Sequence, residues 1–279
     1  MKTELYCYYC DKEFIASKGA KGDHIIPDAL GGRITFLNVC KECNDRLNRE
    51  ADLYLIKEYK PLTILFGIRP EKNKKYSKNE IEFDDFSILG FSGKVRATLS
   101  SNGVRIKNQV IELNDKRKIR VFHDKKQKHK FLSSNKSDKF DGYYVPNSDD
   151  IVLGTGMQHC SSDQEKMVIR SLVKSCLNLI GFKRGLTYLK DLELNQAREF
   201  ALHGTNFSDI GVKLPIAHLD KQIYKQFNHV IRIYKEEDTL MGLVFLFGQH
   251  GRKITLARPF KKDFDDILQY FSYTPQENF

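Results

Sequence analysis

The sequence predicts an α+β protein in two parts, a small N-terminal module over residues 1–60 and a larger mixed α/β part over residues 61–279. Three observations predict this organisation. Four cysteines fall in the first part as two C-x-x-C pairs. Helical and alternating hydrophobic patterns follow one another along the chain without any internal repeat. Near Pro61 the period changes from helical to alternating, and the charge balance changes at the same point.

A helix is predicted in the first part, because Leu47, Ala51, Leu55 and Tyr59 recur at i+4 spacing in "NVCKECNDRLNREADLYLIKEY". Pro61 is expected to end it. The alternating segments that follow predict strands, and residues 124–150 are polar and are expected to form a long loop. The strand segments are "KVRATL", "GVRIKNQVIEL" and "KIRVF".

A long helix is predicted in "SSDQEKMVIRSLVKSCLNLIGF", with an apolar stripe that includes Cys176 and with Gly181 as its C-terminal cap. A short helix ended by Gly204 is predicted in "LNQAREFALHG". Cys176 is expected in the core. Three strands are predicted in the tail, in "HVIRIYK", "LMGLVFLFG" and "KITLARPF".

Composition limits the functional classes. The longest apolar stretches are far too short to cross a bilayer. Glu4 lies where a signal peptide needs an apolar core, so export is not expected and a cytoplasmic location is. The net charge of +10 is uneven, since residues 1–60 are formally neutral and residues 61–150 carry nineteen basic against twelve acidic side chains. An excess of positive charge favours nucleic acid as a partner, and a soluble basic protein without such a partner is the alternative.

Zinc binding is predicted from the cysteine spacing. Cys7 and Cys10 form one C-x-x-C pair, and Cys40 and Cys43 form the other. A two-residue spacer lets a tight turn direct both sulfurs at one ion, and two such pairs complete a closed Cys₄ site. A closed site leaves no position for water, so this zinc is expected to stabilise the fold of a 60-residue module whose core is small.

A second site is suggested by Asp23, His24, Asn38 and Asn44, which lie among the cysteines in "DHIIPDALGG" and "LNVCKECN". Carboxylate and amide oxygens suit a hard divalent ion such as Mg²⁺. A neutral imidazole beside that ion can take a proton from water that attacks a phosphodiester. Taken singly, these residues are equally consistent with a surface pair and with turn or cap positions.

Together with "CYYC", these motifs resemble the HNH endonucleases, in the subgroup whose ββα-metal (treble-clef-like) hairpin is braced by a Cys₄ zinc. The resemblance covers roughly residues 5–50. It implies that His24 activates the water, that Asp23 binds the catalytic metal, and that Asn38 fixes His24 through backbone contacts. At the last motif position, where a histidine is usual, this sequence has Asn44. Similar nucleases with a phage-resolvase type of motif also have an asparagine there, and the resemblance implies that Asn44 completes the metal site. An Asp and Asn oxygen pair favours Mg²⁺ or Mn²⁺.

A basic stretch, "KRKIRVFHDKKQKHKF", follows in the second part and suits contact with a phosphate backbone. A solvated strand edge protected by lysines is the alternative. The residues expected to contact nucleic acid are Lys116, Arg117, Lys118, Arg120, Lys125, Lys126, Lys128 and Lys130.

The leading hypothesis is therefore an Mg²⁺-dependent DNA endonuclease of restriction or phage defence, in which residues 61–279 form a DNA-recognition or sensing domain. One alternative is a zinc-stabilised nucleic-acid-binding protein that has lost catalysis. Another is an RNase with the same site. A homodimer and an activating ligand or partner are left open by the sequence.

Overall fold

The computed structural model describes residues 3–16, 22–68, 80–88, 91–100, 102–134, 140–146, 162–205, 212–214, 229–248 and 250–272. The protein is mixed α and β, as predicted. It forms two compact units, one of Met1–Lys60, Ile68–Lys72 and Cys160–Phe279 and the other of Pro61–Gly67 and Asn73–His159. These units differ from the expected division into 1–60 and 61–279, because the C-terminal residues pack with the N-terminal segment.

The N-terminal segment begins with two short antiparallel hairpins. Strand β1 (Thr3–Tyr6) pairs with β2 (Glu13–Ala16), and β3 (Asp23–His24) pairs with β4 (Thr35–Phe36). A short 3-10 helix, η1 (Asp28–Leu30), lies between β3 and β4. The chain then turns at Gly31, which has a φ of 93°, and a Cβ on Gly32 would lie 1.8 Å from the Ile26 carbonyl oxygen. This Gly-Gly turn therefore requires glycine.

The predicted helix that begins at the second cysteine pair is present and is longer than expected. It consists of α1 (Lys41–Leu47), a π-helical segment, η2 (Asn48–Asp52), and α2 (Leu53–Leu65). The predicted apolar stripe is buried. The expectation that Pro61 ends the helix is wrong, since Pro61 lies inside α2. Proline removes one N–H from the ladder, and the helix continues beyond it with the Phe66 amide donating to the Leu62 carbonyl at 2.9 Å.

A central helix, α4 (Ser162–Arg184), corresponds to the predicted long helix. Gly181 is inside this helix and is not its cap, which corrects the sequence prediction. A Cβ on Gly181 would lie 2.5 Å from the ring of Phe36, so glycine is needed where α4 approaches β4. Two shorter helices follow, α5 (Leu186–Asp191) and α6 (Asn195–His203), and α6 ends at Gly204 with a φ of 67°, as predicted.

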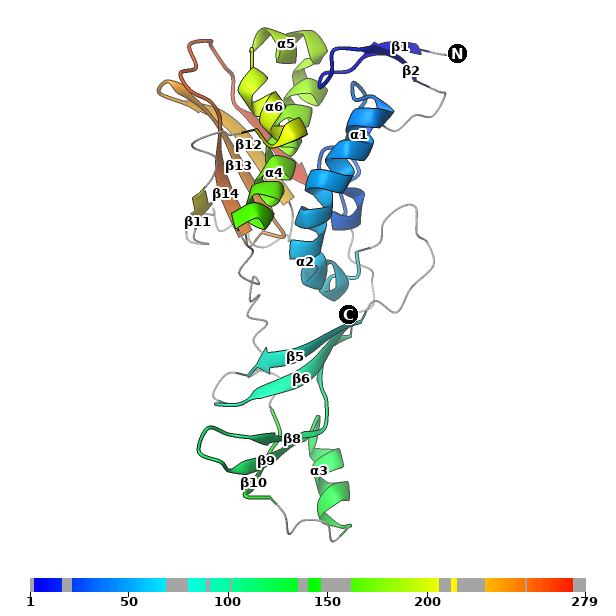
Figure 1. Ribbon diagram of the computed structural model, residues 1–279, viewed down its shortest axis with the longest axis vertical. Coiled ribbons are helices and arrows are strands. Elements are labelled where there is room, and N and C mark those ends of the chain that lie inside the picture. The colour runs from blue at the N-terminus through cyan, green and yellow to red at the C-terminus, as the bar shows by residue number, and fades with distance from the viewer. Residues whose placement is uncertain are drawn as a thin grey trace. The chain divides into compact units, whose positions relative to one another are not determined.

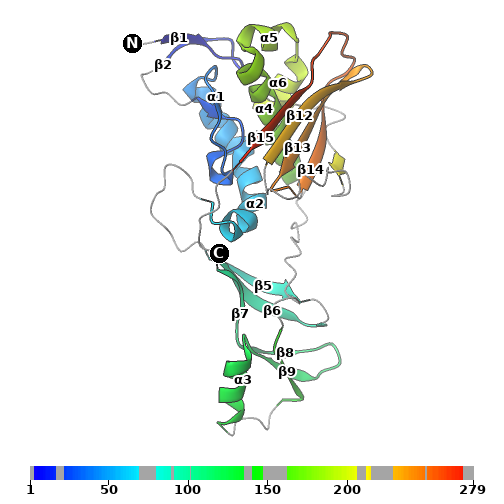
Figure 2. The ribbon, with the colours of Figure 1, turned by 180° about the vertical axis from the view of Figure 1, so that it is seen from behind.

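The C-terminal strands form one antiparallel sheet with the order β11-β14-β13-β12-β15. Its strands are β11 (Val212–Leu214), β12 (His229–Glu236), β13 (Thr239–Leu246), β14 (His250–Ala257) and β15 (Ile267–Phe271). The three predicted tail strands are β12, β13 and β14. Figure 2 shows the unpredicted β15 beside β12. Helix α4 lies between this sheet and the α1–α2 helix (Figure 1) and contacts β3, β4, β13 and β14.

The N-terminal segment is also tied directly to the sheet. The ring of Tyr59 on α2 stacks on Phe247, with ring centres 5.8 Å apart. The buried His229 of β12 donates from Nε2 to the Leu30 carbonyl at 2.7 Å and accepts at Nδ1 from the Phe247 amide at 3.1 Å. These contacts explain why residues 1–60 and the C-terminal residues form one compact unit.

The second unit contains two small sheets. One has the order β5-β6-β7 and the other β10-β9-β8. The strands are β5 (Ile81–Ser87), β6 (Lys94–Ser100), β7 (Gly103–Ile106), β8 (Gln109–Glu112), β9 (Lys118–Val121) and β10 (Gly142–Tyr144). The segment predicted as one strand from residue 103 to 113 is thus divided into β7 and β8. One core cluster of this unit consists of Phe86, Ile88, Val95, Ala97, Ile106 and Val121.

A helix, α3 (Lys125–Leu132), occupies part of the region expected to be a long loop, and β10 occupies another part. The sequence prediction was wrong here because Asp124 caps the helix, accepting from the Gln127 amide at 2.8 Å. Phe131 then packs on Phe122, with ring centres 5.3 Å apart. None of the described helices is long and apolar enough to cross a membrane.

Candidate functional site

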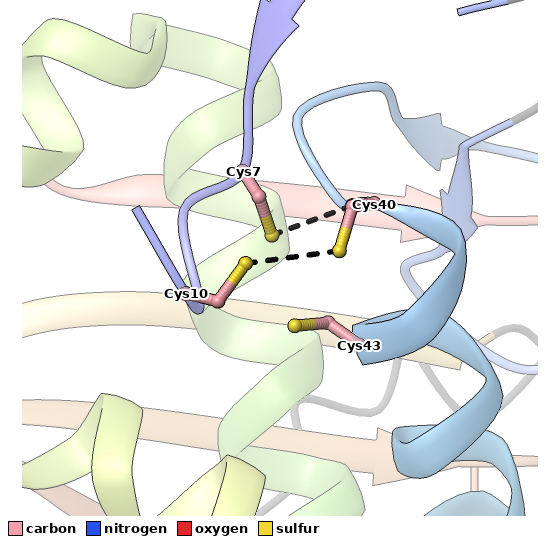
Figure 3. A group of neighbouring side chains, drawn as sticks. All are labelled: Cys7, Cys10, Cys40 and Cys43. Carbon is pink, nitrogen blue, oxygen red and sulfur yellow. Dashed lines mark hydrogen bonds between the residues drawn. The ribbon is translucent and has the colours of Figure 1, made fainter. Parts of the chain in front are cut away.

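Four cysteine side chains meet where the β1–β2 turn approaches the start of α1 (Figure 3). Their sulfurs lie within 4.8 Å of one another, and those of Cys10 and Cys40 are 3.7 Å apart. Tetrahedral zinc with ~2.3 Å bonds places its sulfur ligands about 3.8 Å apart. The Cys40 amide donates to the Cys7 sulfur at 3.3 Å. The cluster could therefore bind zinc.

The thiols of this cluster are strongly polarised by one another. A hydrogen bond from Cys43 lowers the pKa of Cys7 to about 5. The same contact raises the pKa of Cys43, and burial raises the pKa of Cys10. The cluster thus favours a thiolate at Cys7 and disfavours ionisation of Cys10 and Cys43. A bound divalent cation would stabilise all four thiolates together, and four sulfur ligands suit zinc.

Strand β3 carries the Asp23–His24 pair beside this cluster. Asp23 pairs with Phe36, and His24 pairs with Thr35 on β4. Asp23 is 1% exposed, whereas His24 is only partly buried. The two neighbouring side chains therefore have different access to solvent. His24 is the member of the pair with contact to solvent, although its Nδ1 atom is buried.

Asp23 is enclosed by polar side chains of α4. Asn178 Nδ2 donates to Asp23 Oδ2 at 2.7 Å, and the Tyr9 hydroxyl donates to Asn178 Oδ1 at 2.9 Å. Lys174 Nζ lies 3.5 Å from the same Asp23 oxygen. Lys174 also donates to Asp52 Oδ2 at 2.8 Å. Lys174, Asp23 and Asp52 thus form a buried network of three ionisable groups.

The same ammonium reaches the backbone of the candidate catalytic residue. Lys174 Nζ donates to the His24 carbonyl at 2.9 Å, and the Lys174 side chain is completely buried. Asp52 lies at the end of the π-helical segment and also accepts from the Ser171 hydroxyl. π-Helical turns are often found at functional sites.

Burial raises the pKa of Asp23 to about 6, against the opposing effect of the Lys174 ammonium. Burial disfavours the charge on Lys174 as well, but Asp23 and Asp52 hold its pKa above the ordinary value. The surroundings of Asp23 bear on the metal-binding role that the resemblance implies for it. Its carboxylate is shielded from solvent and is already paired with a cation. Its role as a metal ligand stays a prediction.

The two asparagines of the motif lie on either side of the second cysteine pair. Asn38 Nδ2 donates to the Tyr6 carbonyl at 3.1 Å, and the Tyr8 amide donates to the Asn38 carbonyl at 2.8 Å. These bonds hold the end of β1 and the turn of the first cysteine pair against Asn38. Asn44 lies on α1, and its Oδ1 accepts from Asn48 at 2.7 Å. The roles implied for Asn38 and Asn44 stay predictions.

The eight predicted nucleic-acid contacts all lie in the second unit, on the β8–β9 turn, on β9 and on α3. The side chains of Lys125, Lys126 and Lys130 are exposed on α3. Lys128 lies over the ring of Tyr143, 5.9 Å from its centre. Lys116 and Lys118 flank Arg117 and are exposed. The structure therefore brings these residues together around one short strand and one helix.

The two arginines of this group differ in their surroundings. Arg117 pairs with Asp115 at 2.7 Å. Arg120 forms no ion pair with any residue that the structure describes, and its guanidinium lies over the rings of Phe122, Phe131 and Phe140, between 5.2 and 5.9 Å from their centres. Aromatic faces hold a guanidinium in place without neutralising its charge. Arg120 therefore keeps its capacity to pair with an anion.

Sequence reasoning missed Lys174, Asp52 and Asn178. Ser171, Lys174 and Asn178 recur at helical spacing, which is the pattern of a solvated helix face. In the structure, however, α4 is buried on every side between Val168 and Gly181. Periodicity alone does not reveal such coverage.

Residues 7–60 match the family model of the HNH endonucleases. The resemblance suggested by the motifs is thus confirmed for this segment, and the matched segment includes the four cysteines and the Asp23–His24 pair. No curated protein and no solved structure is significantly similar to the chain. This match of residues 7–60 suggests a nuclease, and with it a nucleic acid substrate.

Proposed function

We propose that the protein is a divalent-metal-dependent endonuclease that hydrolyses phosphodiester bonds of DNA, with His24 as its general base. The observation that carries the proposal is the place of His24. It lies on β3 of a strand–strand–helix segment that matches the HNH endonucleases, beside a cysteine cluster that could bind zinc. His24 is only partly buried, although its Nδ1 atom is buried, whereas Asp23 is enclosed.

The chemistry assigned to this chain is a proton transfer at the His24 ring. The neutral imidazole accepts a proton from the attacking water, a new bond forms between that oxygen and phosphorus, and the bond to the leaving oxygen breaks. A divalent cation would stabilise the charge on the leaving oxygen. The amide oxygen of Asn44 fits such an ion. Asp23 does not fit it as placed, because Lys174 and Asn178 surround its carboxylate.

The second unit supports DNA as the substrate. The first turn of α3 contains lysines and no acidic residue. The Asp124 carboxylate already caps this helix end, so the positive charge of the lysines, and not the helix end, is what attracts an anion here. The exposed lysines of α3 and the unneutralised Arg120 therefore favour phosphate contact. The cellular setting of restriction or phage defence, and cleavage of DNA in preference to RNA, remain predictions from the sequence.

Plasmid cleavage tests the proposal. Purified protein should nick or cut plasmid DNA with Mg²⁺ or Mn²⁺ and should be inactive with EDTA. His24→Ala should lower the rate by about 10²–10⁴-fold, the usual contribution of a positioned general base. His203→Ala is the matched control, because His203 is an exposed residue on α6. Wild-type cleavage by folded His24→Ala protein would refute the proposal and would favour a zinc-stabilised binding protein.

Incubation with single-stranded RNA in the same buffers distinguishes the RNase alternative. The proposal predicts that DNA is cleaved faster than RNA of the same sequence. Faster cleavage of RNA by wild-type protein, with the same loss in His24→Ala, would keep the site and change the substrate.

A further inference from the structure

We infer that Lys174 of α4, together with Asp52, positions His24 for catalysis, and that Asp23 belongs to this positioning network and does not bind the catalytic metal. The inference rests on the proposed function, since a positioning role requires that the reaction takes place at His24. It assigns a part of the nuclease site to a helix that begins more than a hundred residues after the family match.

The donors and acceptors around Lys174 are matched in number. An ammonium has three N–H donors and no acceptor. Three oxygens surround the Lys174 ammonium, namely those of the His24 carbonyl at 2.9 Å, Asp52 at 2.8 Å and Asp23 at 3.5 Å. With Lys174 completely buried, water does not replace any of these partners. The direction of the ammonium is therefore fixed by these three oxygens.

Strand β3 needs such support because it is only two residues long. Its pairing with β4 supplies few backbone hydrogen bonds, and His24 is its last residue. Lys174 fixes the His24 carbonyl from one turn of α4. Gly181, two turns later on the same helix, admits the ring of Phe36 from β4. Helix α4 thus holds both strands of the hairpin that carries His24.

Asp23 has the surroundings of a structural anion. Its Oδ2 atom accepts a hydrogen bond from Asn178 and lies 3.5 Å from the Lys174 ammonium, and the side chain is almost completely buried. If Asp23 turned outward to a metal ion, Asn178 would lose its acceptor in a place that water does not reach. Buried donors without partners are rare in native proteins. The network thus explains why an acidic residue precedes His24 without assigning it to a metal.

Steady-state cleavage kinetics on the full-length protein test the inference. The central variant is Lys174→Met, which removes the ammonium and keeps the length of the side chain. The matched control is Lys183→Met on the same helix, where the lysine is exposed. A charge-balanced variant, Lys174→Met/Asp52→Asn, guards against unfolding. In this variant Asp23 is the only charged member of the network, so the net charge of the network is −1. The wild-type network of two carboxylates and one ammonium has the same net charge.

The expected result is a fall in kcat of roughly 10–100-fold for both Lys174 variants, with KM for DNA within about twofold of wild type. Loss of a partner that orients a functional ligand has effects of this size. Zinc content and the melting profile identify the variants that are folded. Lys183→Met should be indistinguishable from wild type. A folded charge-balanced variant with wild-type kcat would overturn the inference.

Two further measurements separate positioning through His24 from a general effect on structure. In the His24→Ala background, under single-turnover conditions, Lys174→Met should lower the residual rate by less than about threefold, because residues that act as a unit are not additive. The same loss as in wild type would overturn the inference. Asp23→Asn should leave the Mg²⁺ concentration for half-maximal rate within about twofold, and a tenfold increase would restore Asp23 as a metal ligand.

These outcomes also distinguish the inference from the proposed function. Full activity in His24→Ala would refute the function itself. An inactive His24→Ala protein combined with a fully active Lys174→Met protein would leave the function intact and would refute only the role of Lys174.

Discussion

Protonation of His229 should destabilise the compact unit that contains the candidate site. The imidazole is completely buried, and both ring nitrogens are engaged. Nε2 donates to Leu30, so the neutral ring must accept at Nδ1 from the Phe247 amide. A second ring proton would leave two N–H groups facing each other. This geometry agrees with a pKa that burial lowers from 6.5 to about 4.

The sign and size of the effect follow from linkage. The folded protein resists a proton that the unfolded chain accepts below pH 6.5. The contribution of His229 to stability is therefore complete above pH 6.5 and is lost as the pH falls toward 4. A difference of about 2.5 pKa units corresponds to about 3 kcal/mol of unfolding free energy.

The assay is urea unfolding followed by circular dichroism, at pH 7.5 and at pH 4, for wild type and His229→Gln. The Gln side chain does not titrate and retains a donor for the Leu30 carbonyl. Asp23 has a raised pKa, so its contribution has the opposite sign and stability from it is lost as pH rises through about 6. The difference between the two proteins at each pH cancels that contribution.

His229→Gln should be less stable at pH 7.5, since the Phe247 amide loses its acceptor. Its disadvantage should shrink by about 3 kcal/mol at pH 4. A difference between the proteins that stays constant from pH 7.5 to 4 would refute the assignment of a buried neutral imidazole.

Three further predictions concern the zinc, the α4 packing and the basic surface. Cys40→Ser should lose the single bound zinc in elemental analysis, whereas Cys176→Ser should retain it; folded wild type without zinc would exclude the Cys₄ site. Gly181→Ala should lower stability by roughly 1–3 kcal/mol through overpacking, measured by urea unfolding, and an unchanged midpoint would contradict the contact. Arg120→Gln should reduce the salt dependence of DNA binding by about 0.9 in log–log slope, measured by anisotropy in EDTA, and equal effects of Arg117→Gln would refute the distinction between the arginines.

Local sequence patterns were sufficient for most helices and strands. The stripe of Leu47, Ala51, Leu55 and Tyr59 predicted a buried helix face, and all four residues are buried. The C-x-x-C spacing predicted that four sulfurs would meet, and they do. Both predictions depend on residues close in sequence, where periodicity and turn geometry determine direction.

The errors arose where a distant segment decides the outcome. Glycine is the usual residue at a helix C-cap, but Gly181 is needed because the ring of Phe36 packs against it. No residue close to 181 in the sequence predicts that contact. The burial of Asp23 was not foreseen either, because its cationic partner, Lys174, lies on α4, far away in the sequence. The long region after residue 124 was expected to be a loop because of its polar composition, and the capping by Asp124 was not recognised.

Electrostatics helps to explain why the C-terminal residues pack with residues 1–60 in one compact unit. A zinc ion can compensate for the small core of a 60-residue module. Asp23 and Asp52 are buried as well, and their shared cation, Lys174, lies on α4. Removal of one partner from a buried ion pair leaves an uncompensated charge, at a cost of about 3–5 kcal/mol. Residues 1–60 therefore contain two buried acidic side chains whose charge is balanced by Lys174 of the C-terminal part. The hairpin that carries His24 thus depends on α4 for its support.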